Sequence, residues 1–138
     1  MFTLVPHTAD VRLLVRAASV EALFADAVFG MYAVMRAAMG DDEGNGTSPV
    51  ARTIAVDDSA DTTALLVDFL NEVLHRAQVA RERFTSVDFT RFDERSLTAQ
   101  LTGIAPASFE EDVKAVTYHE AEVRRDGIDW TTMLVFDL

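Results

Sequence analysis

The sequence contains no cysteine, which excludes disulfide bonds, cysteine-ligated metals and cysteine nucleophiles. A metal ion would therefore depend on oxygen atoms or on histidine. Lysine is nearly absent as well, because Lys114 is the only lysine and all the other basic residues except histidine are arginine. That scarcity makes Lys114 a residue whose position is worth examining.

Positive charge is scarce too, since 12 lysine and arginine residues stand against 23 acidic ones and the formal net charge is −11. This balance argues against an extended basic surface that grips nucleic acid, and we expect no direct nucleic-acid binding. No apolar run approaches the roughly 20 residues of a membrane span, so we expect no membrane association. The opening MFTLVPHTAD lacks the features of an export signal, and we expect a cytoplasmic location.

At 138 residues the chain is long enough to bury a core, and we expect one domain, residues 1–138. Residues 19–35 and 61–83 place apolar side chains at the spacing of one-faced helices. Ser19 and Asp61 are natural N-caps for these two helices.

The other segments predict strands and turns. Residues 11–17 and 50–56 are short strand candidates, and from Phe84 onward the period changes to two. Four alternating segments follow, residues 84–92, 96–105, 113–125 and 130–138, with the turn sequences DERS and DGID among them. They favour meander-like antiparallel pairing.

A stretch rich in Gly, Asp, Asn, Ser and Pro, residues 39–50, predicts a loop. The order strand, helix, strand, helix and then strands predicts an α+β fold. We expect a mostly antiparallel sheet with two helices packed on one face.

The stretch PHTAD, residues 6–10, places His7, Thr8 and Asp10 just before the first of these strands. Turn chemistry explains such a stretch, because Thr and Asp side chains often bond to nearby backbone amides. The functional alternative is a carboxylate at a rigid strand entrance, from which a metal ligand can project, with His7 as an assisting residue.

The chain ends on VFDL, where Asp137 and the carboxylate of Leu138 supply up to four oxygen atoms. Hard cations such as Ca²⁺ and Mg²⁺ take oxygen ligands. Asp10 and Asp137 can converge if the first and last strands share a sheet, and a cation would relieve the repulsion between them. A solvated acidic terminus remains the alternative, because no spacing rule links two acids so far apart.

Lys114 and His119 lie in the segment EEDVKAVTYHEAEV, residues 110–123. A lysine beside EED is usually part of a surface charge pair, and a histidine on an alternating strand is usually an ordinary side chain. The functional alternative presents both to a partner surface or near a phosphate.

A row of Asp68, Glu72 and His75 follows one flank of the second predicted helix. Such rows are usually the solvated side of a helix, and metal binding is the alternative. The sequence contains no Gly-rich phosphate loop, HExxH motif or nucleophile elbow. We therefore expect no enzyme.

Four ordered motifs, HTADV, LLVDFLNEVL, VKAVTYHEAEV and a terminal VFDL, together resemble the archease family from His7 to Leu138. The resemblance implies a small α+β protein that assists the GTP-dependent RNA-splicing ligase. In that role an archease promotes guanylylation of the ligase and its multiple turnover without being the catalyst. The long glycine-rich stretch at residues 39–50 is a departure from the family pattern, and it lies outside the four motifs.

The resemblance also implies a divalent metal, Ca²⁺ with Mg²⁺ or Mn²⁺ as alternatives, bound by Asp10, Asp137 and Leu138. Lys114 and His7 become candidate contacts with the ligase or its nucleotide. Two other functions stay open. One is a chaperone-like modulator of another RNA-processing enzyme, such as a tRNA methyltransferase, and the other is a small metal-dependent hydrolase with His7 as its base.

Overall fold

The computed structural model describes residues 1–5, 10–36 and 46–138. The two helices in these residues are α1 (Val20–Val34) and α2 (Thr62–Ala80). The strands are β1 (Phe2–Val5), β2 (Val11–Ala17), β3 (Ser48–Val56), β4 (Arg83–Phe92), β5 (Leu97–Ala105), β6 (Ala115–Thr117), β7 (Arg124–Asp126) and β8 (Asp129–Asp137).

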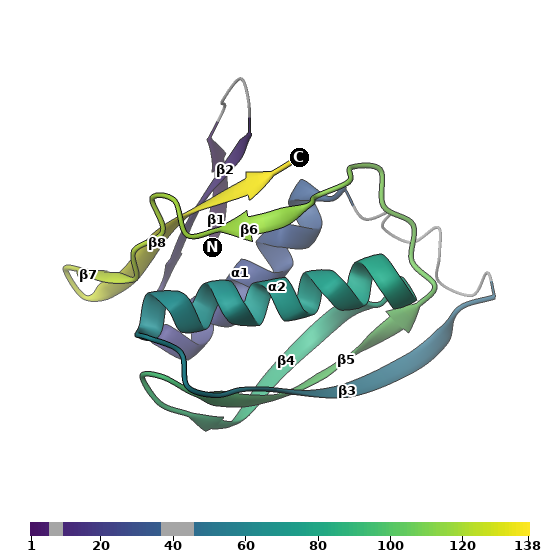
Figure 1. The fold of residues 1–138 in the computed structure, drawn as a ribbon, viewed down its shortest axis with the longest axis horizontal. Coiled ribbons are helices and arrows are strands. Elements are labelled where there is room, and N and C mark those ends of the chain that lie inside the picture. The colour runs from purple at the N-terminus through teal and green to yellow at the C-terminus, as the bar shows by residue number, and fades with distance from the viewer. Residues whose placement is uncertain (6–9, 37–45) are drawn as a thin grey trace.

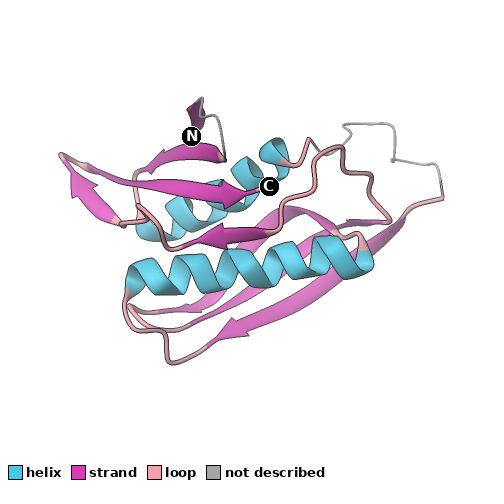
Figure 2. Ribbon diagram, turned by 45° about the horizontal axis from the view of Figure 1, so that its top comes forward, coloured by secondary structure: helices cyan, strands magenta, loops and turns pink. Residues whose placement is uncertain are grey.

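The strands form two antiparallel sheets with the helices between them (Figure 1). One sheet has the order β1-β2-β8-β6, with β7 also paired to β8, and the other has the order β3-β5-β4. Helix α1 contacts β2 and β4, and α2 contacts β6 and β3, so each helix touches both sheets (Figure 2). The predicted α+β class, with antiparallel strands and two helices, is confirmed. The division of the strands into two sheets is a feature that the sequence pattern did not disclose.

The burial of α1 explains its place between the sheets. Its buried residues cover a little over half of the helix circumference and include Leu23, Phe24, Ala27, Val28, Gly30, Met31, Tyr32 and Val34, whereas Glu21 and Ala33 are exposed. A helix with so wide an apolar stripe is covered on more than one side. At the sheet of β3, β5 and β4, the ring of Phe24 packs edge-on against Phe92, with 4.9 Å between ring centroids.

Both helices begin where local chemistry predicts. The Ser19 hydroxyl accepts a hydrogen bond from the Ala22 amide at 3.1 Å, and the Asp61 carboxylate accepts one from the Ala64 amide at 2.8 Å. Each side chain satisfies a donor of the first turn that has no partner within the helix. Neither helix in the described residues is long and apolar enough to cross a membrane.

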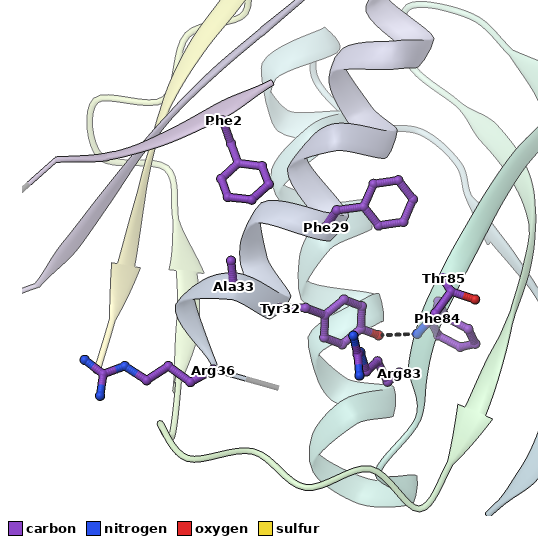
Figure 3. A pocket seen from close by; sticks show the side chains of 8 residues that line it. All are labelled: Phe2, Phe29, Tyr32, Ala33, Arg36, Arg83, Phe84 and Thr85. Atoms are coloured by element: carbon purple, nitrogen blue, oxygen red, sulfur yellow. Dashed lines mark hydrogen bonds between the residues drawn. The ribbon is translucent and has the colours of Figure 1, made fainter. Parts of the chain in front are cut away.

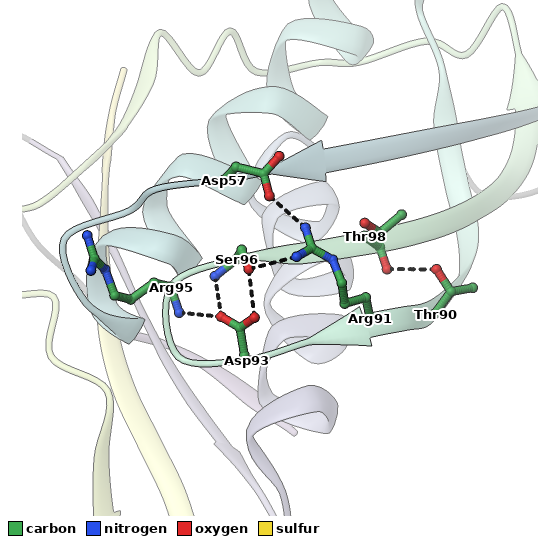
Figure 4. A network of polar contacts seen from close by, with 7 residues as sticks. All are labelled: Asp57, Thr90, Arg91, Asp93, Arg95, Ser96 and Thr98. Atoms are coloured by element: carbon green, nitrogen blue, oxygen red, sulfur yellow. Dashed lines mark hydrogen bonds and ion pairs between the residues drawn. The ribbon is translucent and has the colours of Figure 1, made fainter.

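The predicted turn at DERS is confirmed as the β4–β5 connection (Figure 4). The Asp93 carboxylate accepts hydrogen bonds from the amides of Arg95 and Ser96, both at 2.9 Å, and from the Ser96 hydroxyl at 2.7 Å. The bond from the Arg95 amide is the main reason why the pKa of Asp93 lies below its usual value. Arg91, at the end of β4, extends to the carboxylate of Asp57 at 2.6 Å.

The stretch predicted as a loop, residues 39–50, was predicted too long at its end. Strand β3 begins at Ser48, inside the stretch predicted as a loop, and it tolerates Pro49 because it is an edge strand. Residues 46 and 47 precede the strand, and residues 39–45 lie outside the described residues.

The predicted strand at residues 113–125 is two short strands, β6 and β7, separated by residues 118–123. Strands β5 and β6 belong to different sheets, so the expected meander is limited to the β4–β5 hairpin and the β7–β8 hairpin. Strand β1 was not predicted.

Candidate functional site

The register between β2 and β8 brings the two predicted acidic residues to the same end of the sheet that contains β1, β2, β8 and β6. Val11 is paired with Phe136. Asp10 directly precedes Val11 and Asp137 directly follows Phe136, so in an antiparallel pair the two aspartates occupy neighbouring positions. The structure thus places side by side two residues from opposite ends of the sequence.

Strand β6 adds Lys114 to this end of the sheet. Ala115 is paired with Asp137, and the backbone amide of Lys114 donates a hydrogen bond to the Asp137 carbonyl at 2.7 Å. The starts of β2 and β6 and the C-terminus accordingly lie close together (Figure 1). We call the group of Asp10, Lys114, Asp137 and Leu138 the terminal acidic site.

The terminal acidic site is open to solvent on one side. Asp137 and Lys114 are exposed, and Leu138 is 38% exposed. Asp10 is half-buried, and its Oδ1 atom is buried. The two aspartate carboxylates and the terminal carboxylate would offer only oxygen atoms to a ligand, and oxygen atoms are the donors that hard divalent cations take.

The described residues contain no group of three or more His, Asp or Glu side chains arranged to hold a metal. At the terminal acidic site, the carboxylate of Leu138 would be the third oxygen donor group beside the two aspartates. His7 and Thr8, the other candidates of the PHTAD motif, lie outside the described residues.

Asp68 belongs to a hydrogen-bond network. Its carboxylate accepts hydrogen bonds from the Ser59 hydroxyl at 2.8 Å and from the Tyr118 hydroxyl. The bond to Asp68 is the main cause that raises the pKa of Tyr118 to about 12. The row of Asp68, Glu72 and His75, all of them described residues, forms no metal-binding group.

Sequence reasoning missed Asn71 and Gln78 on α2. The Asn71 side-chain amide bonds to both the N–H and the C=O of Val116, each at 3.0 Å, and Gln78 donates to the Val113 carbonyl at 2.8 Å. The available signal was Asn71, an uncharged polar residue in the mostly apolar segment LLVDFLNEVL. A polar residue between buried apolar ones generally has a hydrogen-bond partner.

An apolar pocket of about 460 Å³ lies between β1, α1 and the start of β4, and none of its lining residues belongs to the terminal acidic site (Figure 3). It is lined by Phe2, Phe29, Tyr32, Ala33, Arg36, Arg83, Phe84 and Thr85. The Tyr32 hydroxyl donates to the Glu82 carbonyl and accepts from the Phe84 amide, both at 3.1 Å. Burial raises the pKa of Tyr32 above its ordinary value.

These features define a class of protein: a small α+β domain in which two sheets enclose two helices. Acidic residues lie together at the end of one sheet, where β2 begins and β8 ends. The Archease protein family model matches residues 2–138. The archease of Methanosarcina barkeri is 31% identical over 140 residues, which cover 96% of this chain and 92% of that protein. The archease of Methanosarcina acetivorans is 28% identical over the same shares of both chains.

Two solved structures share the fold. The Thermotoga maritima archease, described as a possible chaperone, matches with a TM-score of 0.68 at 19% identity over 97% of this chain and 94% of that one. Protein 1598 of Methanobacterium thermoautotrophicum has a TM-score of 0.68 at 22% identity, over 99% and 98%. The chain belongs to the archease family, and the resemblance inferred from its four motifs is confirmed.

Proposed function

We propose that this protein is a metal-binding accessory factor that activates a GTP-dependent RNA-splicing ligase. It promotes guanylylation of the ligase and its multiple turnover, and it is not itself the catalyst. Membership of the archease family supports the role. The observation that carries it is the β2–β8 register, which makes neighbours of Asp10 and Asp137.

Asp10, Asp137 and the terminal carboxylate of Leu138 would hold the metal. Their negative charges repel one another at close range, and a cation between them removes that cost. Ca²⁺ suits the site best because it tolerates irregular oxygen geometry, and Mg²⁺ and Mn²⁺ are the alternatives. When bound, the ion brings positive charge to the place where the ligase reacts with GTP.

The charge of the protein supports a basic, RNA-binding partner. A net charge of −11 attracts such a partner over a distance, which speeds encounter and selects against acidic proteins. Lys114 is the candidate contact with the ligase or its nucleotide, because it is exposed and its backbone is bonded to Asp137. His7 is the second candidate contact. A partner that holds the RNA is consistent with our expectation that this chain does not bind RNA directly.

Purified ligase, GTP and this protein provide the test, with formation of guanylylated ligase as the readout. Asp10→Ala and Asp137→Ala should lose the stimulation. Asp88→Ala is the matched control, because Asp88 is an exposed carboxylate on β4 of the other sheet and its removal changes the net charge equally. Stimulation by both site variants at the level of the parent protein would refute the metal role.

A chaperone-like role for another RNA-processing enzyme is the second candidate, because the Thermotoga maritima relative is described as a possible chaperone. A tRNA methyltransferase would be such a client. Affinity purification distinguishes the two candidates. Recovery of a methyltransferase without the ligase supports the second, and recovery of the ligase supports the first.

A further inference from the structure

Two side-chain amides of α2 occupy the place of a missing neighbour strand beside β6. Strand β6 has only three residues and pairs with β8 along one edge. On α2, Asn71 bonds to the backbone N–H and C=O of Val116, and Gln78 bonds to the Val113 carbonyl. Buried backbone groups need such partners, and the helix supplies them here.

The spacing of these contacts fits a segment that runs along the helix. Asn71 and Gln78 are two helical turns apart, or ~10.5 Å at the usual rise. Val113 and Val116 are three residues apart, or ~10 Å in an extended chain. The two distances agree, and the higher residue number on α2 meets the lower one on the segment. The segment therefore runs antiparallel to α2, and β6 lies alongside this helix (Figure 2).

Lys114 lies between the two held residues. Val113 and Val116 are buried, at 0% and 3% exposure, whereas Lys114 is exposed. The Lys114 amide donates to the carbonyl of Asp137, the last residue of β8. A chain end normally frays unless it is tied down. The bond from Lys114 ties this end down at the terminal acidic site.

We propose that Asn71 and Gln78 are positioning residues, whose side-chain amides fix residues 113–116 and through them the places of Lys114 and Asp137. Neither residue belongs to the terminal acidic site. The consequence for metal binding rests on the proposed function, whereas the positioning itself does not.

Amide hydrogen exchange followed by NMR tests the positioning directly. Asn71→Leu and Gln78→Met keep the size of each side chain and remove its hydrogen bonds. Thr63→Val is the matched control, because it also removes one hydrogen bond from α2. The Thr63 hydroxyl accepts that bond at 2.9 Å from the Val123 amide, which lies between β6 and β7 and not in residues 113–116. The amides of β2 serve as the internal reference for global unfolding.

The Lys114 amide donates its hydrogen bond to Asp137 and not to a substituted side chain, so its exchange rate reports where the segment lies. We expect this rate to rise roughly two- to tenfold for each hydrogen bond removed in Asn71→Leu and Gln78→Met. Thr63→Val should leave it unchanged. Unchanged exchange in both test variants, or an equal rise in Thr63→Val, would overturn the proposal.

Calorimetric titration with Ca²⁺ separates this proposal from the proposed function. Asn71→Leu should bind Ca²⁺ more weakly than the parent protein, and Thr63→Val should bind it equally well. If the parent protein binds no Ca²⁺, the proposed metal role fails and the exchange rates still decide the positioning. If the parent binds Ca²⁺ and Asn71→Leu binds it equally well, the link between positioning and the metal is wrong.

Discussion

Arg52→Met should destabilise the fold far more than Glu82→Met, although the two residues form one ion pair. The Glu82 side chain is 1% exposed, and its Oε2 atom accepts from Arg52 Nε at 2.8 Å and lies 2.7 Å from Arg52 Nη2. The Oε1 atom of Glu82 is buried and has no hydrogen-bond partner in the described part of the chain. Arg52, in contrast, is 39% exposed.

The difference in exposure sets the magnitudes. Removing one partner of a buried pair costs about 3–5 kcal/mol, because the remaining charge is buried without compensation. Water can approach the site from the side of Arg52, so we expect a loss near the lower end, about 3 kcal/mol, for Arg52→Met. In Glu82→Met the guanidinium can turn into solvent, and the loss should stay below about 1 kcal/mol.

Urea unfolding measures both free energies by linear extrapolation. The double variant Arg52→Met/Glu82→Met should lie within about 1 kcal/mol of Glu82→Met, because the arginine matters only while the buried carboxylate is present. Equal losses in the two single variants, or a loss below about 1 kcal/mol in Arg52→Met, would show that the buried Glu82 carboxylate does not need the positive charge of Arg52 for its stability.

Two further predictions concern a glycine and a tyrosine. A Cβ on Gly103 would lie 1.9 Å from the backbone carbonyl oxygen of Arg83. Gly103→Ala should therefore destabilise the protein by about 3 kcal/mol in urea unfolding. A loss below about 1 kcal/mol would contradict this contact. In a Tyr32→Phe background, tyrosinate absorbance should show Tyr118 titrating at about 12, and Asp68→Asn should lower that pKa toward 10. Because the folded-state pKa is raised, the contribution of Tyr118 to stability is complete below pH 10 and is lost as the pH rises through about 12. An unchanged titration in Asp68→Asn would exclude Asp68 as the cause.

Features that depend on neighbouring residues in the sequence were predictable. The two helices and their caps at Ser19 and Asp61 follow from apolar spacing and from side chains that bond three residues ahead. The turn at DERS follows from the ability of Asp93 to bond to the next backbone amides.

Features that depend on distant residues were not predictable from pattern alone. Residues 113–125 alternate like one strand, yet hydrogen bonds from Asn71 and Gln78 hold the beginning of this segment along α2. Alternation cannot show whether the neighbour of a strand is another strand or a helix. For the same reason the division into two sheets was not visible.

The terminal acidic site illustrates the same limit. Residue chemistry identified Asp10 and Asp137 as separate candidates, and only the resemblance to archeases paired them. The structure supports that pairing through the register of β2 and β8, a long-range fact that no local rule contains.

Calorimetric titration with Ca²⁺ of the parent protein and of a variant extended by one glycine after Leu138 tests the central claim most directly. The extension converts the Leu138 carboxylate into an amide and moves the terminal charge away from Asp10 and Asp137. An N-terminal extension is the control. Met1 forms an ion pair with Asp26, and its neighbour Phe2 is paired with Val15, five residues along the chain from Asp10. We predict that the C-terminal extension weakens binding roughly tenfold or more, because ligand charge sets the affinity of such sites, and that the N-terminal extension leaves it unchanged. Equal Ca²⁺ affinities of all three proteins would contradict a metal site at the end of the chain.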